Sequence, residues 1–415
     1  MILCNKFIYV KILVKTTMET NMQEILLNSI EKCFNWIEKE MLTFNRGSWG
    51  IYERIRIDQN ERVCLSRPDT ASEFLVAVNG YRKFIKTNKY DVVFENVFKW
   101  LFFVQNTNEQ VDGSFCFAFI DGNKTYACDQ SLYQNDNGKI LINLLSLYEE
   151  NGDKRYFDMA KSLANFWVSI QREDGCFHND DIKILQIFPK APCFVMWMMA
   201  AMFQAYKVFE EEKYLIAGKK AFRYIKSCIK NGRLLTSFEI EGTENWRPVS
   251  SENVIAIYTF AHAYRYYQDE ELLNCAEIIK TYVRKLIDEN TGAVKNCDIE
   301  SIEASQNSNL DDCDLVYTES FALNAFVEAY EVFGDEEYLE WAKNLASWLC
   351  DVQCKNENPL WDGGWRGSYN LVKKSWSGRC NQNNLKDEGG MYSVYTGWTA
   401  LPIVMGMLQL LKNIK

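Results

Sequence analysis

The sequence predicts an all-α protein in which twelve helices form a closed ring, six of them inside and six outside. Apolar residues recur at helical spacing almost throughout 22–411, and two kinds of helix alternate along the chain. One kind is amphipathic, which is typical of a surface helix, whereas the other is apolar on all sides and must be buried. Because this pair of helices occurs six times, we expect a single (α/α)6 toroid.

The amphipathic helices are the predicted outer ring. Residues 154–171, KRYFDMAKSLANFWVSIQ, show one apolar stripe and one polar face. The same pattern predicts outer helices at Gln23–Leu42, Tyr90–Gln105, Lys154–Gln171, Glu212–Lys230, Glu270–Asp288 and Asp335–Gln353.

The apolar helices are the predicted inner ring. The stretch CFVMWMMAAMFQAYKVF, residues 193–209, has no face that suits water. Their starts, near 70, 137, 194, 253, 319 and 396, differ by 67, 57, 59, 66 and 77 residues, which marks an internal repeat. The predicted inner helices are Ala71–Phe84, Gly138–Tyr148, Phe194–Phe209, Val254–Tyr267, Ser320–Phe333 and Gly397–Leu411.

A turn containing glycine and an apolar residue follows the outer helices and repeats with them. Asp-Gly favours a tight turn, so we interpret this element as structural, with its apolar residue tucked beneath the ring. The fourth repeat has only the degenerate copy NGRLLTSF. The other copies are Gly47–Trp49, Asp112–Phe115, Asp174–Phe177, Thr291–Val294 and Asp362–Trp365.

The connections differ in length, and this difference indicates where a ligand binds. Links from inner to outer helices are short, such as Glu149–Lys154, whereas links from outer to inner helices are long. Since all inner helices begin at the same end of the ring, the long loops gather on that face, where functional loops are expected. The long loops cover 43–69, 106–136, 172–193, 231–252, 289–318 and 354–395.

Composition excludes some functions. The net charge of −10 disfavours binding to nucleic acid, and no apolar run approaches the roughly 18 residues that a membrane span needs. We interpret residues 1–22 as a disordered or mis-started tail and residues 23–415 as the toroid domain. The 14 cysteines are scattered without a C-x-x-C pair, which favours buried free thiols and a cytoplasmic location.

Asn135–Phe177 resembles the six-hairpin glycosidase superfamily in its order of inner helix, Gly-Asp turn, outer helix and Q-x-x-D-G turn. The resemblance extends over all six repeats and implies a toroid that acts on carbohydrate without a cofactor. That superfamily includes inverting glycoside hydrolases and unsaturated glucuronyl hydrolases, while lyases, sugar epimerases, terpene cyclases and prenyltransferases share the toroid.

The sequence departs from three kinds of toroid enzyme, and these departures narrow the activities that the resemblance implies. Toroidal sugar epimerases rely on barrel histidines, but only His178 and His262 occur here, and His262 falls within a helix. Class II terpene cyclases carry D-x-D-D, whereas Asp311–Asp314 has another order and lies in a predicted loop. We expect that triplet to be a solvated loop and expect no metal site, and no prenyltransferase zinc set is recognisable.

Glycosidic cleavage needs an acid and a base, and four carboxylates lie at inner-helix starts on the long-loop face. Asp136 and Glu319 are the leading pair, because repeats two and five face each other across the axis. Asp69 and Glu252 are the reserve pair. Each carboxylate has a second interpretation, as a helix cap.

Aromatic and arginine side chains of the same face are candidates for holding the sugar, and loop packing is the alternative for each of them. Arginine would suit a carboxylate-bearing sugar. The candidates are Trp49, Arg67, Tyr133, Trp246, Tyr317, Trp361, Trp365, Arg366, Tyr395 and Trp398, with Arg247 and Tyr392 nearby.

We therefore expect a glycoside hydrolase with a pair of acid–base carboxylates. Two alternatives stay open: a toroid that binds or modifies a glycan or peptide without hydrolysis, and an isoprenoid cyclase or transferase. A hydrolase needs two carboxylates in a polar cleft, whereas a cyclase needs an aromatic cavity with one acid.

Overall fold

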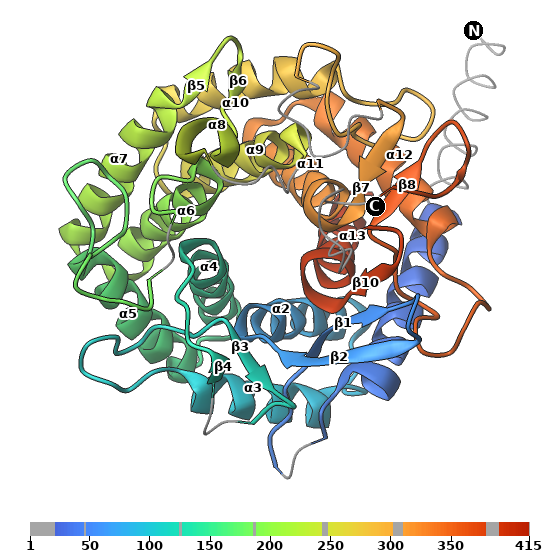
Figure 1. Ribbon diagram of the computed structural model, residues 1–415, viewed down its shortest axis with the longest axis horizontal. Helices are drawn as coiled ribbons and strands as arrows, with labels where there is room; N and C mark the ends of the chain where they lie inside the picture. Colours follow the sequence, from blue (N-terminus) through green and yellow to red (C-terminus); the bar gives the residue numbers. More distant parts are fainter. Residues whose placement is uncertain are drawn as a thin grey trace, which may run out of the picture.

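The computed structural model describes residues 21–44, 47–123, 127–185, 188–242, 248–301, 310–378 and 390–414. In this part of the chain the helices form a closed double ring, which confirms the predicted toroid (Figure 1). The inner helices are α2 (Pro68–Ile85), α4 (Gln134–Asn151), α6 (Pro192–Phe209), α9 (Val249–Tyr266), α11 (Ser320–Phe333) and α13 (Leu401–Asn413).

The outer ring begins with a helix over 21–36 that continues as the π-helix η1 (Ile37–Met41). Two further π-helices, η3 (Leu315–Glu319) and η4 (Thr396–Ala400), lead into α11 and α13. The other outer helices are α3 (Asp91–Val104), α5 (Lys154–Ser169), α7 (Glu212–Ser227), α10 (Glu270–Arg284) and α12 (Glu336–Val352). Several inner helices start earlier than predicted, because polar residues of their first turns are buried as part of the helix.

Gly-Asp turns join inner to outer helices. Gly152 ends α4 in the left-handed conformation with a φ of 69°, and the Asp153 side chain then accepts a hydrogen bond from the Arg155 amide at the start of α5. Gly334 and Asp335 repeat this arrangement between α11 and α12. The glycine tolerates the positive φ and the aspartate caps the next helix, so both residue types have a local cause.

Glutamine side chains link consecutive outer helices through hydrogen bonds. The Gln171 side-chain amide donates to the carbonyl of Gly175 in its own turn, 3.1 Å away, and to the carbonyl of Ala217 in α7, 2.9 Å away. Gln105 makes the same pair of bonds one repeat earlier, to Gly113 and Met159. Gln353 donates to Gly363 and to Ser29 of the first helix, so the same contact closes the ring. The Q-x-x-D-G turn is therefore structural, as expected.

The glycine of this turn lies against the backbone of the next outer helix. A Cβ at Gly175, whose φ is 95°, would lie 2.3 Å from the Lys220 carbonyl oxygen. At Gly363 the corresponding distance to the Lys32 carbonyl oxygen is 2.6 Å. Both the positive φ and the close approach require glycine.

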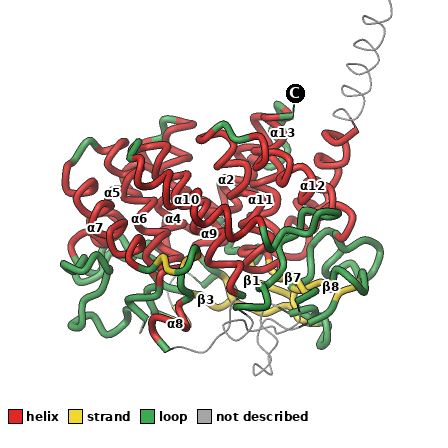
Figure 2. The backbone as a smooth tube through the Cα atoms, turned by 90° about the horizontal axis from the view of Figure 1, so that it is seen from above, coloured by secondary structure: helices red, strands yellow, loops and turns green. Residues whose placement is uncertain are grey.

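Short strands cover the long-loop end of the ring, where the sequence predicted loops alone (Figure 2). An antiparallel sheet has the order β10-β1-β2-β3-β4, so it joins the last repeat to the first two. These strands are too short to show a clear alternating pattern. They are β1 (Tyr52–Arg56), β2 (Glu61–Ser66), β3 (Ala118–Ile120), β4 (Ala127–Asp129) and β10 (Ser393–Tyr395).

Smaller elements complete this face. The pair β5 (Ile229–Lys230) and β6 (Arg233–Leu234) precedes α8 (Ser237–Glu241). The strands β7 (Asp312–Asp314), β8 (Ser368–Asn370) and β9 (Ser375–Trp376) form a separate sheet. The expected solvated loop at Asp311–Asp314 is thus wrong. Asp312 is 2% and Asp314 1% exposed, and Asp314 caps η3 by accepting from the Tyr317 amide.

In three repeats, a side chain near the start of the inner helix accepts a hydrogen bond from the backbone amide of the apolar turn residue. Asn137 accepts a hydrogen bond from the Phe115 amide, at 2.9 Å, and Asn253 accepts one from the Leu234 amide, at 2.9 Å. Glu319 does the same for the Val294 amide at 2.8 Å. The degenerate fourth repeat therefore keeps the contact although its sequence pattern is lost.

Other expectations concern the whole chain. The cysteines whose side chains the structure describes are free thiols, and all of these but Cys64 are buried. No described helix is long and apolar enough to cross a membrane. No group of three or more candidate metal ligands occurs among the described residues. The expected tail, 1–22, lies outside them except for its last two residues, which are helical.

Replacing the turn glycine should destabilise the ring. Gly175→Ala adds a clash with Lys220, which we expect to cost about 1–3 kcal/mol beyond the strain of the positive φ. Gly152→Ala is the matched control, since its φ is also positive but no atom lies within 4 Å of the added Cβ. It should cost about 1–2 kcal/mol. Urea unfolding measures both, and equal losses would contradict the clash.

Glu319→Gln should gain stability relative to wild type as the pH rises. Burial raises the pKa of Glu319 well above its ordinary value of 4.5, and Asp314 adds to this. Above that ordinary value the unfolded chain releases the proton while the folded chain keeps it, so wild-type stability falls with pH. Glutamine accepts the same Val294 hydrogen bond and does not titrate. Unfolding free energies at about pH 5 and about pH 8 test this, and an unchanged difference between the two proteins would refute it.

Candidate active site

A buried guanidinium lies at the long-loop end of the inner ring. Arg67 precedes α2, and its side chain is 7% exposed. Its Nε and Nη2 atoms donate to the two oxygens of Asp69, at 3.0 and 2.9 Å. Nη1 lies 3.1 Å from Glu53 of β1, and Nη2 lies 2.8 Å from Asp136 of α4. One cation therefore joins carboxylates from three elements.

Lys139 of α4 is the second buried cation of this cluster. Its ammonium lies 2.8 Å from Glu73 Oε1 and 3.1 Å from Asp69 Oδ2. It also lies 3.7 Å from the ring centroid of Trp398, within the range of a cation–π contact. Asp69 is thus shared by both cations, whereas Glu73 contacts Lys139 and Asp136 contacts Arg67.

Trp398 of η4 completes the cluster from the last repeat. Its indole nitrogen donates to Asp69 Oδ2 at 2.9 Å, and its backbone has a φ of 57°. The preceding Gly397 lies so close to α2 that a Cβ there would be 2.2 Å from Thr70 Oγ1. A left-handed conformation at a bulky residue is costly and often marks a functional site.

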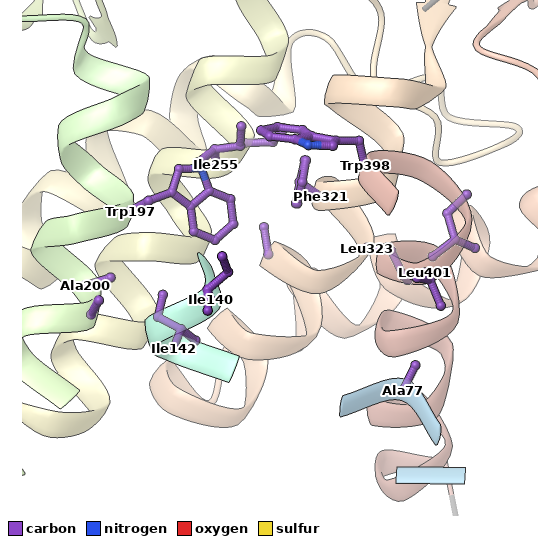
Figure 3. Close-up of a cluster of buried hydrophobic side chains, with 14 of the residues drawn as sticks. Ala77, Ile140, Ile142, Trp197, Ala200, Ile255, Phe321, Leu323, Trp398 and Leu401 are labelled. Atoms are coloured by element: carbon purple, nitrogen blue, oxygen red, sulfur yellow. The ribbon is translucent and has the colours of Figure 1, made fainter. Parts of the chain in front are cut away.

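Aromatic rings surround these charges. Trp398 packs edge-on against Tyr317, with ring centroids 5.7 Å apart, and against Phe321 at 5.4 Å. Figure 3 shows Phe321 lying between Trp398 and Trp197, whose centroid is 5.4 Å from that of Phe321. On the other side Arg67 lies over Phe117, at 4.3 Å, and the Phe117 ring contacts Tyr133. The arrangement combines apolar ring faces with fixed charges, the two kinds of group that contact sugars in proteins.

The carboxylates differ in protonation. Burial alone would raise the pKa of Asp69, but the charges of Arg67 and Lys139 outweigh it and lower that pKa to about 2. Burial raises the pKa of Glu73, and the neighbouring charge of Asp69 adds to the rise although Lys139 opposes it. Asp69 is therefore a permanent anion, whereas Glu73 holds a proton to higher pH than an ordinary glutamate.

A small cavity lies beside Glu73 and Lys139. It measures about 20 Å³ and is also lined by Trp197, Tyr258 and Phe321. Such a space holds about one water molecule. A water placed there would contact both the acid and the ammonium group.

The structure brings together two of the four predicted carboxylates, Asp69 and Asp136, but from adjacent repeats and not across the axis. The expected pair of Asp136 and Glu319 is wrong, because Glu319 is fully buried and bound to the Val294 amide. The reserve pair fails likewise. Glu252 accepts hydrogen bonds from the Ser237 amide and hydroxyl, at 3.0 and 2.9 Å, and so fixes α8. A side chain at the start of an inner helix can point toward a loop or toward the axis of the ring. Hydrophobic periodicity does not distinguish these two directions.

The predicted sugar-binding residues separate into two groups. Arg67, Tyr133, Tyr317 and Trp398 lie in or beside the cluster, and the Tyr395 hydroxyl accepts a hydrogen bond from Arg54 at 3.0 Å. The others lie elsewhere: Trp49 packs on Phe44, Trp365 is core, Trp361 and Arg366 bind Glu357, and Trp246 and Arg247 fall outside the described residues.

Sequence reasoning missed Glu53, Glu73 and Lys139. Glu53 lies in an unpredicted strand and gave no signal. Glu73 and Lys139 did give one, since each is a charged residue inside a helix that is otherwise buried. A charge in such a place needs a partner of opposite sign.

No protein-family model and no curated protein matches the chain. Solved structures resemble it in fold. A sugar epimerase from a ruminal bacterium has a TM-score of 0.70 at 14% identity, covering 95% of this chain and 99% of that one. A family 76 α-mannanase from Bacteroides thetaiotaomicron has a TM-score of 0.63 at 13% identity, covering 94% and 96%.

A third solved structure is an unsaturated glucuronyl hydrolase specific for heparin, with a TM-score of 0.61 at 12% identity, covering 95% of this chain and 96% of that one. All three match nearly the whole length of both chains, at identities that inform on fold alone. The chain therefore shares the (α/α)6 toroid fold of these solved structures.

Proposed function

We propose that this chain is a carbohydrate-active enzyme, and more narrowly a glycoside hydrolase. Its acid and base would come from the Arg67–Lys139 cluster, which consists of Glu53, Arg67, Asp69, Glu73, Asp136, Lys139 and Trp398. The observation that carries the proposal is a set of buried carboxylates with different proton affinities, surrounded by aromatic rings, at the long-loop end of the ring. The named activities of the solved structures with this fold, a sugar epimerase and two hydrolases, support the broader class.

Asp69 is a positioning residue in this proposal. Its oxygens accept from Arg67, Lys139 and Trp398, and it does not hold a proton near neutral pH. Its function is to fix the two cations and the indole ring relative to one another, as a shared anion can do in a site of low dielectric.

Glu73 is the candidate acid. Its raised pKa keeps it protonated at higher pH than an ordinary glutamate, as protonation of a leaving oxygen requires. Asp136 is the candidate base. Its Oδ2 accepts from Arg67 and its Oδ1 accepts from Asn135, at 3.1 Å, which orients the carboxylate. Hydrolysis needs an acid and a base, and in this proposal they come from the adjacent inner helices α2 and α4.

The cluster favours a neutral sugar over an acidic one. All three guanidinium nitrogens of Arg67 already face carboxylates, so that residue has no edge left for a substrate carboxylate. Counting Arg54, Arg67 and Lys139 against Glu53, Asp69, Glu73 and Asp136 gives 3 − 4 = −1 when all are ionised, and 3 − 3 = 0 when Glu73 holds its proton as the acid. The cluster therefore has no net positive charge to attract an acidic sugar. We therefore propose a neutral sugar rather than the carboxylate-bearing sugar that the arginines of the sequence suggested.

Sugar epimerisation is the second candidate, favoured by the fold shared with a sugar epimerase. Related toroidal epimerases use histidines, but neither histidine of this chain contacts the cluster. His178 pairs with Asp180 in a loop, and His262 bonds to Glu328 and Gln204 near the other end of the inner helices. This distribution ranks hydrolysis first.

Removing the acid or the base should abolish most turnover. We expect Asp136→Asn and Glu73→Gln each to lower kcat by about 10²–10⁴ on the best neutral oligosaccharide found by screening. Glu319→Gln is the matched control, because it makes the same change at a buried carboxyl group that binds the Val294 amide, and it should leave kcat within about tenfold. Product analysis by NMR distinguishes cleavage from epimerisation. Full activity in both cluster variants would exclude this assignment.

The pH profile should identify the acid. Because Glu73 must be protonated to act, kcat should fall as pH rises through its pKa, which burial places above the ordinary value of 4.5. In Glu73→Gln the residual activity should lose this alkaline decline. The same decline in wild type and variant would assign the acid to another group.

A further inference from the structure

A second cavity lies at the short-loop end of the inner ring, where no function has been assigned above. It measures about 340 Å³, within the range of small-molecule sites. Buried polar side chains form its wall, among them Asn143, His262, Asn324 and Glu328, which are 5–7% exposed. The lining also includes Glu149, Tyr266 and Lys412 from the last turns of α4, α9 and α13, so the cavity opens at the end opposite the helix starts. The strands cover the end where the helices start (Figure 2).

The wall is held rigid by a hydrogen-bond network. The two ring nitrogens of His262 lie 3.3 Å from Glu328 Oε1 and 3.0 Å from Gln204 Oε1. Arg265 binds both oxygens of Glu328, at 2.8 and 3.0 Å, and also binds Glu331. Gln409 donates to Glu328 and Glu331 as well. A cavity with prearranged polar groups binds ligands at little entropic cost.

Glu149 is the unneutralised charge of this wall. Among the described residues it accepts hydrogen bonds from Gln204 Nε2, at 2.7 Å, and from the Tyr266 hydroxyl, at 2.9 Å, and makes no ion pair. The adjacent Glu150 is instead paired with Lys83, at 3.1 Å. Two neutral donors thus orient this exposed carboxylate, and no cation of the described residues forms an ion pair with it.

The charge balance of the cavity lining favours a cationic ligand. The carboxylates lining the cavity are Glu149, Glu150, Glu328 and Glu331, and the lining cations are Arg265 and Lys412. With Lys83, which pairs with Glu150, the balance is 3 − 4 = −1. The negative ends of the inner-helix dipoles point to the same end, which also favours a cation.

Aromatic faces offer contacts to carbon. His262 stacks on Tyr258, with centroids 5.7 Å apart, and packs against Tyr266 at 5.1 Å. The Tyr258 and Tyr266 side chains also line the cavity, beside the amides of Asn143 and Asn324. Rings together with amides suit a ring-shaped molecule that carries hydroxyl groups.

We propose that the short-loop cavity binds a small polyhydroxylated amine, of the size of a hexosamine, whose ammonium group pairs with Glu149. The hydroxyl groups meet Asn143, Asn324 and the Glu328 network, and the sugar face meets the tyrosine rings. This site is separate from the Arg67–Lys139 cluster and does not depend on the hydrolase proposal.

Calorimetry with three probes of similar shape tests the ligand class. Glucosamine should bind to the full-length protein, whereas glucose and N-acetylglucosamine, which lack the charge, should bind at least about tenfold more weakly. Glu149→Gln should weaken glucosamine binding about tenfold, because a charge-assisted hydrogen bond is lost. Glu150→Gln is the matched control and should change it little, since Lys83 already neutralises that residue.

The location is tested by filling the cavity. Gly80 of α2 lines it, and a Cβ there meets only Leu408 Cδ1, at an ordinary 3.6 Å. Gly80→Leu should abolish glucosamine binding, while Gly80→Ala should retain it, with circular dichroism confirming the fold of both. Binding that survives Gly80→Leu places the ligand elsewhere and overturns the proposal. So does equal affinity for glucose, or the absence of saturable binding up to millimolar glucosamine.

Discussion

Arg67 places one buried cation among carboxylates of β1, α2 and α4, and through Asp69 it is connected to Lys139 and Trp398. Removing it would leave several carboxylates close together in a site with little water, which is strongly unfavourable. The long-loop end of the ring depends on this contact, because it ties the first two repeats, the sheet and the closing π-helix η4 to a single point.

The first turns of the inner helices serve two purposes with similar residues. In repeats two, four and five, Asn137, Asn253 and Glu319 reach outward and hold the backbone of a turn. In repeats one and two, Asp69, Glu73 and Asp136 take part in the charged cluster. Asparagine and glutamate can both accept a backbone amide, so the carboxylate alone does not distinguish an anchor from a reactive group. What distinguishes them is whether cations lie nearby.

The inner ring carries polar groups at both ends. The cavity beside Glu73 and the larger short-loop cavity share Asn143, Tyr258 and Asn324 in their linings, so the two are neighbours along the axis. Their electrostatics differ. Around Arg67 the carboxylates are bound by cations from several elements, whereas at the other end Glu149 is bound by neutral donors among the described residues. The proposals of an uncharged sugar at the first site and an amine at the second follow from this difference.

The sequence by itself determined the ring, because helical periodicity, fully apolar helices and a repeated Gly turn are local signals that each repeat carries. It also predicted Arg67, Asp69, Asp136 and Trp398 on the long-loop face, where the structure brings them into contact. It did not determine their partners. Lys139 and Glu73 meet across two helices, and Glu319 turns to Val294, because side-chain direction at a helix start follows from packing against distant segments. Only the tertiary structure brings those segments together. It also places beside each carboxylate the charges that raise or lower its pKa.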